Sequence, residues 1–202
     1  TNMFKMFYSC KNFNQSLNNW DVSNVTNMNY MFFFNISFNQ PLNKWNVSNV
    51  KYMESMFNKA NSFNQIINDW DVSNVRNLSF LFYNCESFNQ PLDKWNVSNV
   101  QNLNCIFNKT YNFNQPLNTW DVSNVKNMSA MFCGAKAFNQ PLDNWDVSNV
   151  LDMNSMFKDT ELFNQSLNKW NPNPLMISNL YMFQRSKSFD LINALWYKEI
   201  LR

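Results

Sequence analysis

The chain has 202 residues, a formal net charge of +2, one glycine and no histidine, and 45% of its residues are hydrophobic. Without histidine there can be no Ser-His-Asp triad and no histidine metal ligand, and one glycine cannot form a glycine-rich phosphate loop. Lysine and arginine are scattered singly rather than clustered in a stripe, so the charge pattern predicts no nucleic-acid binding.

The N-terminal stretch TNMFKMF matches TNMNYMF at 26–32, so residues 1–12 are assigned to a partial first coil of a repeat. Met3, Met6 and Phe7 have no earlier coil to cover them, and apolar surface of this kind is seldom left bare. We therefore expect either further repeats before Thr1 or docking of this end on a partner or on the end of another copy. No run approaches about 18 apolar residues, so the segment predicts no membrane insertion.

A period of 25 residues continues as far as residue 170. Tryptophan recurs at this interval from Trp20 to Trp170, and FNQ from Phe13 to Phe163. A fixed period of this length is typical of stacked repeats and falls in the leucine-rich-repeat range. Residues 1–170 are therefore interpreted as one array of tandem repeats.

Each repeat predicts two short elements. In LNNWDVSNV, Leu17, Trp20 and Val22 follow the pattern L-x-x-W-x-V, which indicates a short strand with one buried face. The stretch SNVTNMNYMF, which overlaps the end of the strand and continues to Phe32, places its apolar residues at helical spacing and predicts a helical turn. No coil can bury these side chains alone, so the coils must stack.

Two columns of asparagine keep the same register. An asparagine side chain carries both a donor and an acceptor, so a column of them can bond to the coils on either side. The candidate ladders consist of Asn14, Asn39, Asn64, Asn89, Asn114, Asn139 and Asn164, and of Asn24, Asn49, Asn74, Asn99, Asn124 and Asn149.

The outward residues of the predicted strand form a candidate binding face. Aligned carboxylates about 4.8 Å apart would repel, and alternation of Asp with Asn weakens that repulsion. A ligand surface and a merely solvated ladder therefore both fit the pattern. The candidate residues are Asn19, Asp21, Lys44, Asn46, Asp69, Asp71, Lys94, Asn96, Thr119, Asp121, Asn144, Asp146 and Lys169.

Catalysis would have to rest on a carboxylate pair such as Asp69 and Asp71, or Asp143 and Asp146, as in carbohydrate-active solenoid enzymes. These residues also fit solvated exterior positions, and we predict neither enzymatic activity nor a cofactor. Four cysteines without a CxxC pair predict no metal site and free, mostly buried thiols.

The last part of the chain breaks the pattern. NPNPL replaces DVSNV at 171–175, and Phe189, Ile192 and Trp196 recur at helical spacing. Residues 171–202 therefore predict a degenerate last coil that ends in a C-terminal capping helix.

The unit FNQSLNNWDVSNVTNMNYMF at 13–32 resembles the repeat of the BspA-like leucine-rich-repeat surface proteins. These are also known as mycoplasma-type lipoprotein repeats of unknown function, and they occur in giant viruses. The resemblance implies a right-handed, leucine-rich-repeat-like parallel β-solenoid, here of about seven to eight coils. It further implies a non-catalytic scaffold on a cell or virion surface that binds a protein or glycan in adhesion. The alternative is a purely structural capsid or surface spacer.

Overall fold

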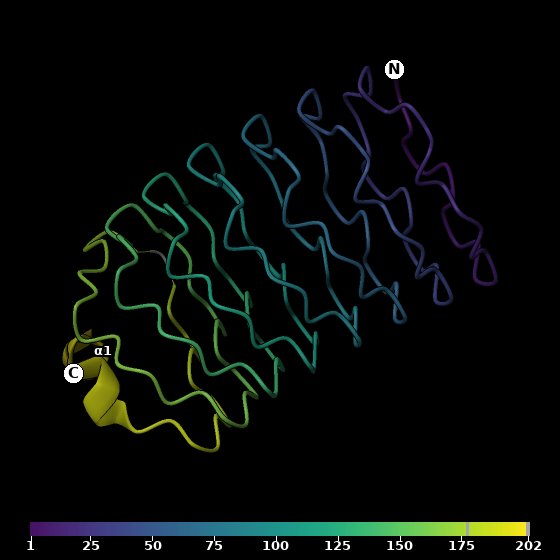
Figure 1. The fold of residues 1–202 in the computed structure, drawn as a ribbon. Helices are drawn as coiled ribbons and strands as arrows, with labels where there is room; N and C mark the ends of the chain where they lie inside the picture. The colour runs from purple at the N-terminus through teal and green to yellow at the C-terminus, as the bar shows by residue number, and fades with distance from the viewer. Residues whose placement is uncertain (177, 201–202) are drawn as a thin grey trace.

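The computed structural model describes residues 1–176 and 178–200, with side chains described as far as Tyr197. The chain forms a row of stacked coils that runs from the N-terminus to a short helix at the other end (Figure 1). Within the described residues the helices are η1, a 3-10 helix at Leu191–Ala194, and α1, an α-helix at Leu195–Ile200. The same residues contain no named strand.

The predicted parallel β-solenoid, with a strand and a helical turn in each coil, is wrong. Where the strand was expected, the N–H of Trp20 donates to the carbonyl of Leu17 at 3.0 Å, and that of Val25 to Val22 at 2.8 Å. These bonds close tight turns within one coil and use N–H groups that a strand would give to its neighbour. We call this segment, residues 17–25 and its equivalents in later coils, the tryptophan wall.

The expected helical turn is instead a row of overlapping turns. The N–H of Met31 donates back to Met28 at 3.2 Å, whereas that of Phe32 donates to Met56 in the next coil at 2.9 Å. Hydrogen bonds within one coil alternate with bonds between coils along this segment. In a helix, all of these bonds would stay within the segment. We call it the turn wall: residues 3–10, 28–35, 53–60, 78–85, 103–110, 128–135, 153–160 and 179–186.

Positive φ angles repeat along the turn wall. Tyr30 (φ 58°) and Phe34 (φ 55°) are each the third residue of a four-residue turn, the position where a type II turn requires φ above zero. Fifteen non-glycine residues of the described chain have positive φ. A non-glycine residue in this region costs about 1–3 kcal/mol unless its surroundings impose it. Here, bonds to the neighbouring coils impose it.

Isolated parallel bridges join consecutive coils just before the turn wall. They connect Asn2 to Asn27, Asn27 to Tyr52, Asn77 to Asn102, Asn102 to Asn127, Asn127 to Asp152 and Asp152 to Ser178. Each coil contributes one bridged residue in this column, so pairing never extends into a strand.

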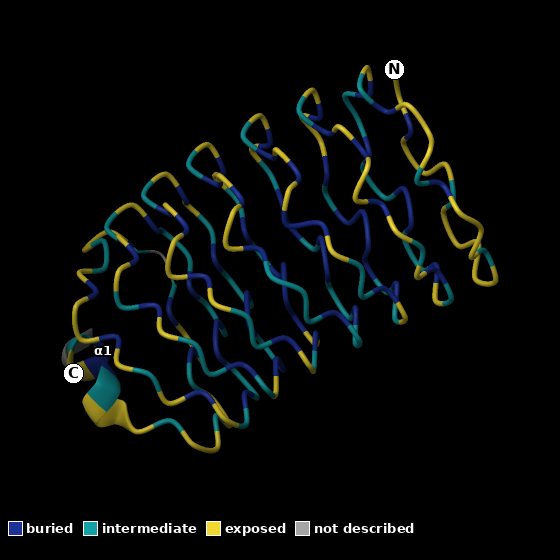
Figure 2. Cartoon of the chain, in the orientation of Figure 1, coloured by how far each residue is buried: buried dark blue, intermediate teal, exposed yellow. Residues whose placement is uncertain are grey.

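Aromatic side chains fill the space between the two walls, where the chain is mostly buried (Figure 2). The rings of Phe32 and Phe57 stack at 5.6 Å between centroids, and those of Trp45 and Trp70 at 6.3 Å. The phenylalanines with less than 2% exposure are Phe32, Phe38, Phe57, Phe63, Phe82, Phe88, Phe107, Phe113, Phe132, Phe138, Phe157 and Phe163. The core is therefore continuous from coil to coil.

The C-terminal end shifts the register by one residue. Trp145 and Trp170 stack 25 residues apart, whereas Trp170 and Trp196 stack 26 apart, at 6.2 Å. The bridge from Asp152 to Ser178 also spans 26 residues, which places the extra residue between Trp170 and Ser178, where NPNPL replaces the usual motif. η1 and α1 follow this segment, and Trp196 of α1 lies against Trp170.

Candidate binding surfaces

The first predicted asparagine column joins consecutive coils. The side-chain oxygen of Asn64 accepts from the backbone N–H of Asn89 at 2.9 Å and from the side-chain nitrogen of Gln90 at 3.0 Å. The same pair of bonds recurs at Asn14, Asn39, Asn89, Asn114 and Asn139. In the last coil the N–H of Asp190 bonds to Asn164 at 2.9 Å.

The second column bonds to backbone carbonyls. The side-chain nitrogen of Asn74 donates to the carbonyl of Ser48 at 2.7 Å. Asn49, Asn99, Asn124 and Asn149 make equivalent bonds, and the backbone carbonyl of Asn24 accepts from the N-terminus at 2.9 Å. Both columns therefore bond between coils, which leaves them little freedom to bind a ligand.

The Asp and Asn column of the predicted binding face has a local structural role. Asp71 accepts the backbone N–H of Ser73 at 3.0 Å, and Asn46 accepts that of Ser48 at 3.1 Å. Asp21, Asn96, Asp121 and Asp146 do the same two residues before their serines. Asp and Asn are interchangeable here because each offers the same oxygen to the turn.

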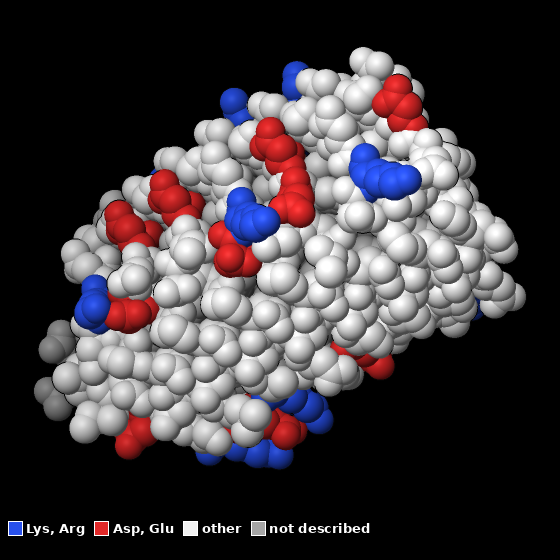
Figure 3. Space-filling model, viewed as in Figure 1, with Lys and Arg blue, Asp and Glu red and all other residues white. Residues whose placement is uncertain are grey.

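The neighbouring column of that face is exposed and partly paired. Lys94 contacts Asp69 at 2.7 Å, and Lys44 donates to Asn19 at 3.1 Å. Lys169 contacts Asp143 at 2.6 Å, and the hydroxyl of Thr119 donates to the carbonyl of Asp93 at 2.8 Å. Asn144 is exposed. On the side of the molecule in Figure 3, some opposite charges touch, other charged groups stand alone, and wide areas carry no charge.

The structure brings Asp69 and Asp71 together around one hollow of about 290 Å³, which Lys94 and Asn96 also line. Both carboxylates are already engaged, one with Lys94 and the other with Ser73. In the second pair, the hydrogen bond from Lys169 lowers the pKa of Asp143. The bond from Ser148 lowers the pKa of Asp146. That pair therefore lacks a carboxyl of raised pKa, which a general acid needs.

The outward residues of the turn wall, together with the residue that follows each turn-wall segment, form a second surface that the sequence pattern did not predict. We call this surface the turn face. These positions differ from coil to coil, as do a few others such as the column of Asn19, and that internal variation was the available signal. The column of Tyr30 contains Lys5, Tyr30, Ser55, Phe80, Cys105, Ala130, Ser155 and Tyr181, of which Ser55 and Cys105 are buried. Two further columns contain Ser9, Phe34, Lys59, Asn84, Lys109, Gly134, Asp159 and Arg185, and Lys11, Ile36, Asn61, Glu86, Tyr111, Lys136, Glu161 and Lys187.

Near the N-terminus the turn face is aromatic and cationic. The ammonium of Lys5 lies 5.1 Å from the ring centroids of both Phe4 and Tyr8. Tyr8 stacks on Phe33 at 4.8 Å, and Lys11 lies 4.6 Å from the ring of Phe34. The rings and the lysines already contact one another at this end.

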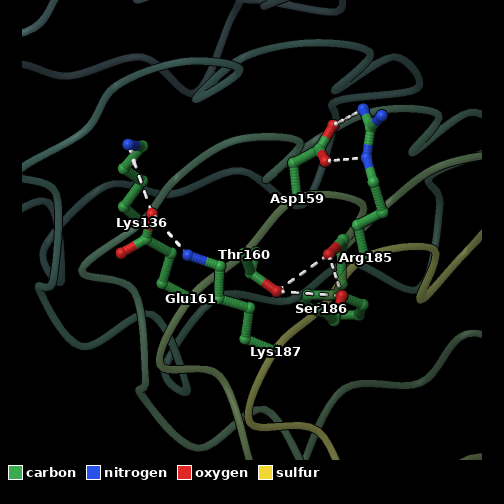
Figure 4. A network of polar contacts seen from close by, with 8 residues as sticks. Lys136, Asp159, Thr160, Glu161, Arg185, Ser186 and Lys187 are labelled. Carbon is green, nitrogen blue, oxygen red and sulfur yellow. Dashed lines mark hydrogen bonds and ion pairs between the residues drawn. The ribbon is translucent and has the colours of Figure 1, made fainter.

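Toward the C-terminus the turn face is charged (Figure 4). Arg185 contacts Asp159 through two nitrogens, at 2.5 and 2.8 Å. Glu161 lies between Lys136 at 3.2 Å and Lys187 at 3.5 Å. The hydrogen bond from Arg185 lowers the pKa of Asp159, and that from Lys136 lowers the pKa of Glu161, so both stay ionised near neutral pH.

All four cysteines are free thiols. Cys85 and Cys105 are buried and Cys133 is half-buried, whereas Cys10 is exposed. Within the described part of the chain, no group of three or more acidic or cysteine side chains could hold a metal ion. In those same residues no helix is long and apolar enough to cross a bilayer.

Stacked copies of one 25-residue unit, joined by recurring Asn, Trp and Phe side chains, define a tandem-repeat protein. The family model described as "Mycoplasma protein of unknown function, DUF285" matches residues 1–92 and 76–196. The chain belongs to this family. No curated protein and no solved structure matches it.

Proposed function

We propose that this chain is a non-catalytic scaffold that binds a protein or glycan partner through its turn face. One observation carries the proposal. The residues that join the coils are nearly constant, whereas the residues of the turn face differ from coil to coil in size, charge and aromatic character. Stability requires the constant positions, and it gives no reason for a different side chain in each coil.

We further propose display on the surface of a cell or a virion, as the resemblance to the BspA-like surface proteins implies. That resemblance concerns the repeat sequence and does not extend to a leucine-rich-repeat fold, because the described coils are built from turns. A structural spacer is the competing function. It would need the same stacked core but no particular turn face.

Site-specific photocrosslinking tests the proposal. A photoreactive amino acid replaces Tyr83, a half-buried residue of the turn wall next to Asn84 of the turn face. As the matched control, it replaces Asn144 on the outer side of the tryptophan wall. Both positions are accessible, and Asn144 is the more exposed of the two. Each protein is incubated with a surface extract of the cells in which it occurs, and adducts are identified by mass spectrometry.

We expect one recurrent adduct from position 83 and none from position 144. Adducts from position 144 alone would place the interaction on the tryptophan wall and overturn the assignment to the turn face. If neither position gave an adduct over the background of an unmodified chain, the spacer function would replace the scaffold function.

A further inference from the structure

A notch interrupts the turn face at residues 128–135. The outward residues of this segment, Ser129, Ala130, Cys133 and Gly134, are all small. The corresponding segments on either side, 103–110 and 153–160, carry longer side chains in the column of Gly134. The resulting hollow is about 360 Å³ and is lined by Lys109, Tyr111, Cys133, Gly134, Lys136, Asp159, Glu161, Arg185 and Lys187.

The single glycine of the chain eases the positive φ at this place, but it is not obligatory there, because other residue types hold the same position in neighbouring coils. Gly134 has φ 71°, but Lys109 and Asp159 hold the same position of neighbouring coils at φ 57° and 59°. A Cβ added at Gly134 would lie 3.4 Å from the Cγ of Lys109, an ordinary contact. Because Gly134 has no side chain, the notch stays open at this position.

The notch has an uncharged floor and a charged rim. Gly134 is buried, and Cys133 and Tyr111 are half-buried, whereas Lys109, Lys136, Arg185 and Lys187 are exposed. Four cations and two carboxylates line the hollow. Arg185 is paired with Asp159, and Lys136 and Lys187 share Glu161, so the lining keeps a formal net charge of +2.

Backbone groups of the notch are already used between coils. The N–H of Gly134 donates to the carbonyl of Lys158 at 2.8 Å, and the carbonyl of Cys133 accepts from Lys109 at 2.8 Å. A bound chain therefore cannot pair with this wall as an added strand and must be recognised by its side chains. Apolar groups suit the floor, and anionic groups suit the rim.

We propose that the notch binds an acidic peptide segment of a protein partner, in which an apolar side chain enters above Gly134 and flanking carboxylates meet the rim cations. This rests on the proposed scaffold function and specifies its partner. A polysaccharide acid would satisfy the rim but would bring no apolar side chain to the floor. The width favours one extended chain, because the two flanking coils lie about 10 Å apart.

The test uses the whole chain and a labelled ten-residue peptide of glutamates with two central leucines, followed by fluorescence anisotropy. Two altered peptides replace the leucines with serine or the glutamates with glutamine, and heparin fragments serve as the polysaccharide probe. The notch variant combines Lys109→Gln with Lys187→Gln. Its matched control combines Lys51→Gln with Lys126→Gln, which removes the same charge from exposed lysines that do not line the notch.

We expect saturable binding of the leucine peptide. Its affinity should be about tenfold weaker for the notch variant and unchanged for the control variant. Both altered peptides should bind more weakly. Gly134→Gln should also weaken binding, while its thermal unfolding and circular dichroism verify that it folds.

Three results would overturn the proposal: no binding of the leucine peptide, equal weakening in both double variants, or heparin binding with no peptide binding. The last would assign the rim to a polysaccharide. If the peptide fails while crosslinking from position 83 succeeds, the scaffold function stands and only the acidic-peptide assignment falls.

Discussion

The indole N–H of Trp95 donates to the backbone carbonyl of Ile67, in the preceding coil, at 3.0 Å. Equivalent bonds are made by Trp45, Trp70, Trp120, Trp145 and Trp170. Trp95 is 2% exposed, whereas Trp20 of the first coil is 41% exposed. The same side chain therefore has a different environment in the first coil and in the interior.

Trp95→Phe should lower the free energy of unfolding by about 2–4 kcal/mol, because it leaves a buried carbonyl without its donor and removes core volume. Trp20→Phe, the matched control, should cost less than about 1 kcal/mol. Urea denaturation of both variants measures the difference. Equal losses would mean that the indole bond contributes little.

Asn89 separates the acceptor role of the ladder from its amide chemistry. Its side-chain oxygen accepts from Asn114 and Gln115, and Asp190 occupies the equivalent position in the last coil. Asn89→Ala should cost about 1–3 kcal/mol because the N–H of Asn114 loses its partner. Asn89→Asp keeps the oxygen and should cost much less at neutral pH. If both changes were equally costly in thermal unfolding, the ladder would need the amide nitrogen as well.

Gly134→Ala should destabilise the chain by about 1 kcal/mol, since alanine disfavours positive φ while the new Cβ meets only an ordinary contact. Gly134→Asn should cost less because asparagine tolerates the left-handed region better. Chemical denaturation distinguishes the two. A loss of several kcal/mol for both would show that the site is sterically closed.

Buried thiols predict a loss of stability at alkaline pH. Burial raises the pKa of Cys85 well above its ordinary range and that of Cys105 to about 11. The folded chain keeps these protons, whereas the unfolded chain releases them above about pH 9, so the free energy of unfolding falls as pH rises from 9 toward 11.

The double variant of Cys85→Ala and Cys105→Ala should flatten that fall, measured by denaturant unfolding at several pH values. Alanine already occupies both columns, at Ala60 and Ala130, so the variant should fold. An unchanged slope between pH 9 and 11 would assign the loss to other groups, such as Tyr197, whose pKa burial also raises.

Removal of residues 191–202 should promote association. Trp196 stacks on Trp170, and Tyr197 meets Phe183 edge-on at 5.1 Å between centroids, so the deletion uncovers apolar rings. Light scattering of the shortened chain should show oligomers. A strictly monomeric product with unchanged stability would contradict the prediction that 171–202 form a degenerate last coil ending in a capping helix.

The repeat, its period and its inward side chains could be predicted from the sequence because apolar residues return every 25 positions as far as Trp170. The backbone structures of the tryptophan wall and the turn wall could not be predicted. L-x-x-W-x-V fits an extended stretch closed by tight turns as well as a strand. Residues such as Lys59 and Tyr30 have little intrinsic preference for positive φ, and only the bonds to neighbouring coils impose it.

The candidate binding face stays a prediction, although part of its sequence pattern has a structural explanation. The alternation of Asp and Asn in the column of Asp71 indicates a charge pattern when only the sequence is considered. In the structure, the side-chain oxygen that both residue types share accepts the N–H of the serine two residues later and closes a turn. The apolar spacing of the turn wall predicts a helix, and that pattern draws attention to the inward residues and away from the outward ones that vary. A comparison of the repeats with one another brings out the turn face as a surface that varies from coil to coil.

Coils joined only to their neighbours also determine how the chain would respond to tension. A pull on the two ends would detach coils from one end of the stack, because each coil is bonded chiefly to the coils on either side. Each detachment would release one repeat of extended chain, about 80 Å once the spacing of the coil in the stack is subtracted. The force trace would then be a regular sawtooth, and a protein attached at such an end would sit on an extensible tether whose length grows in equal steps.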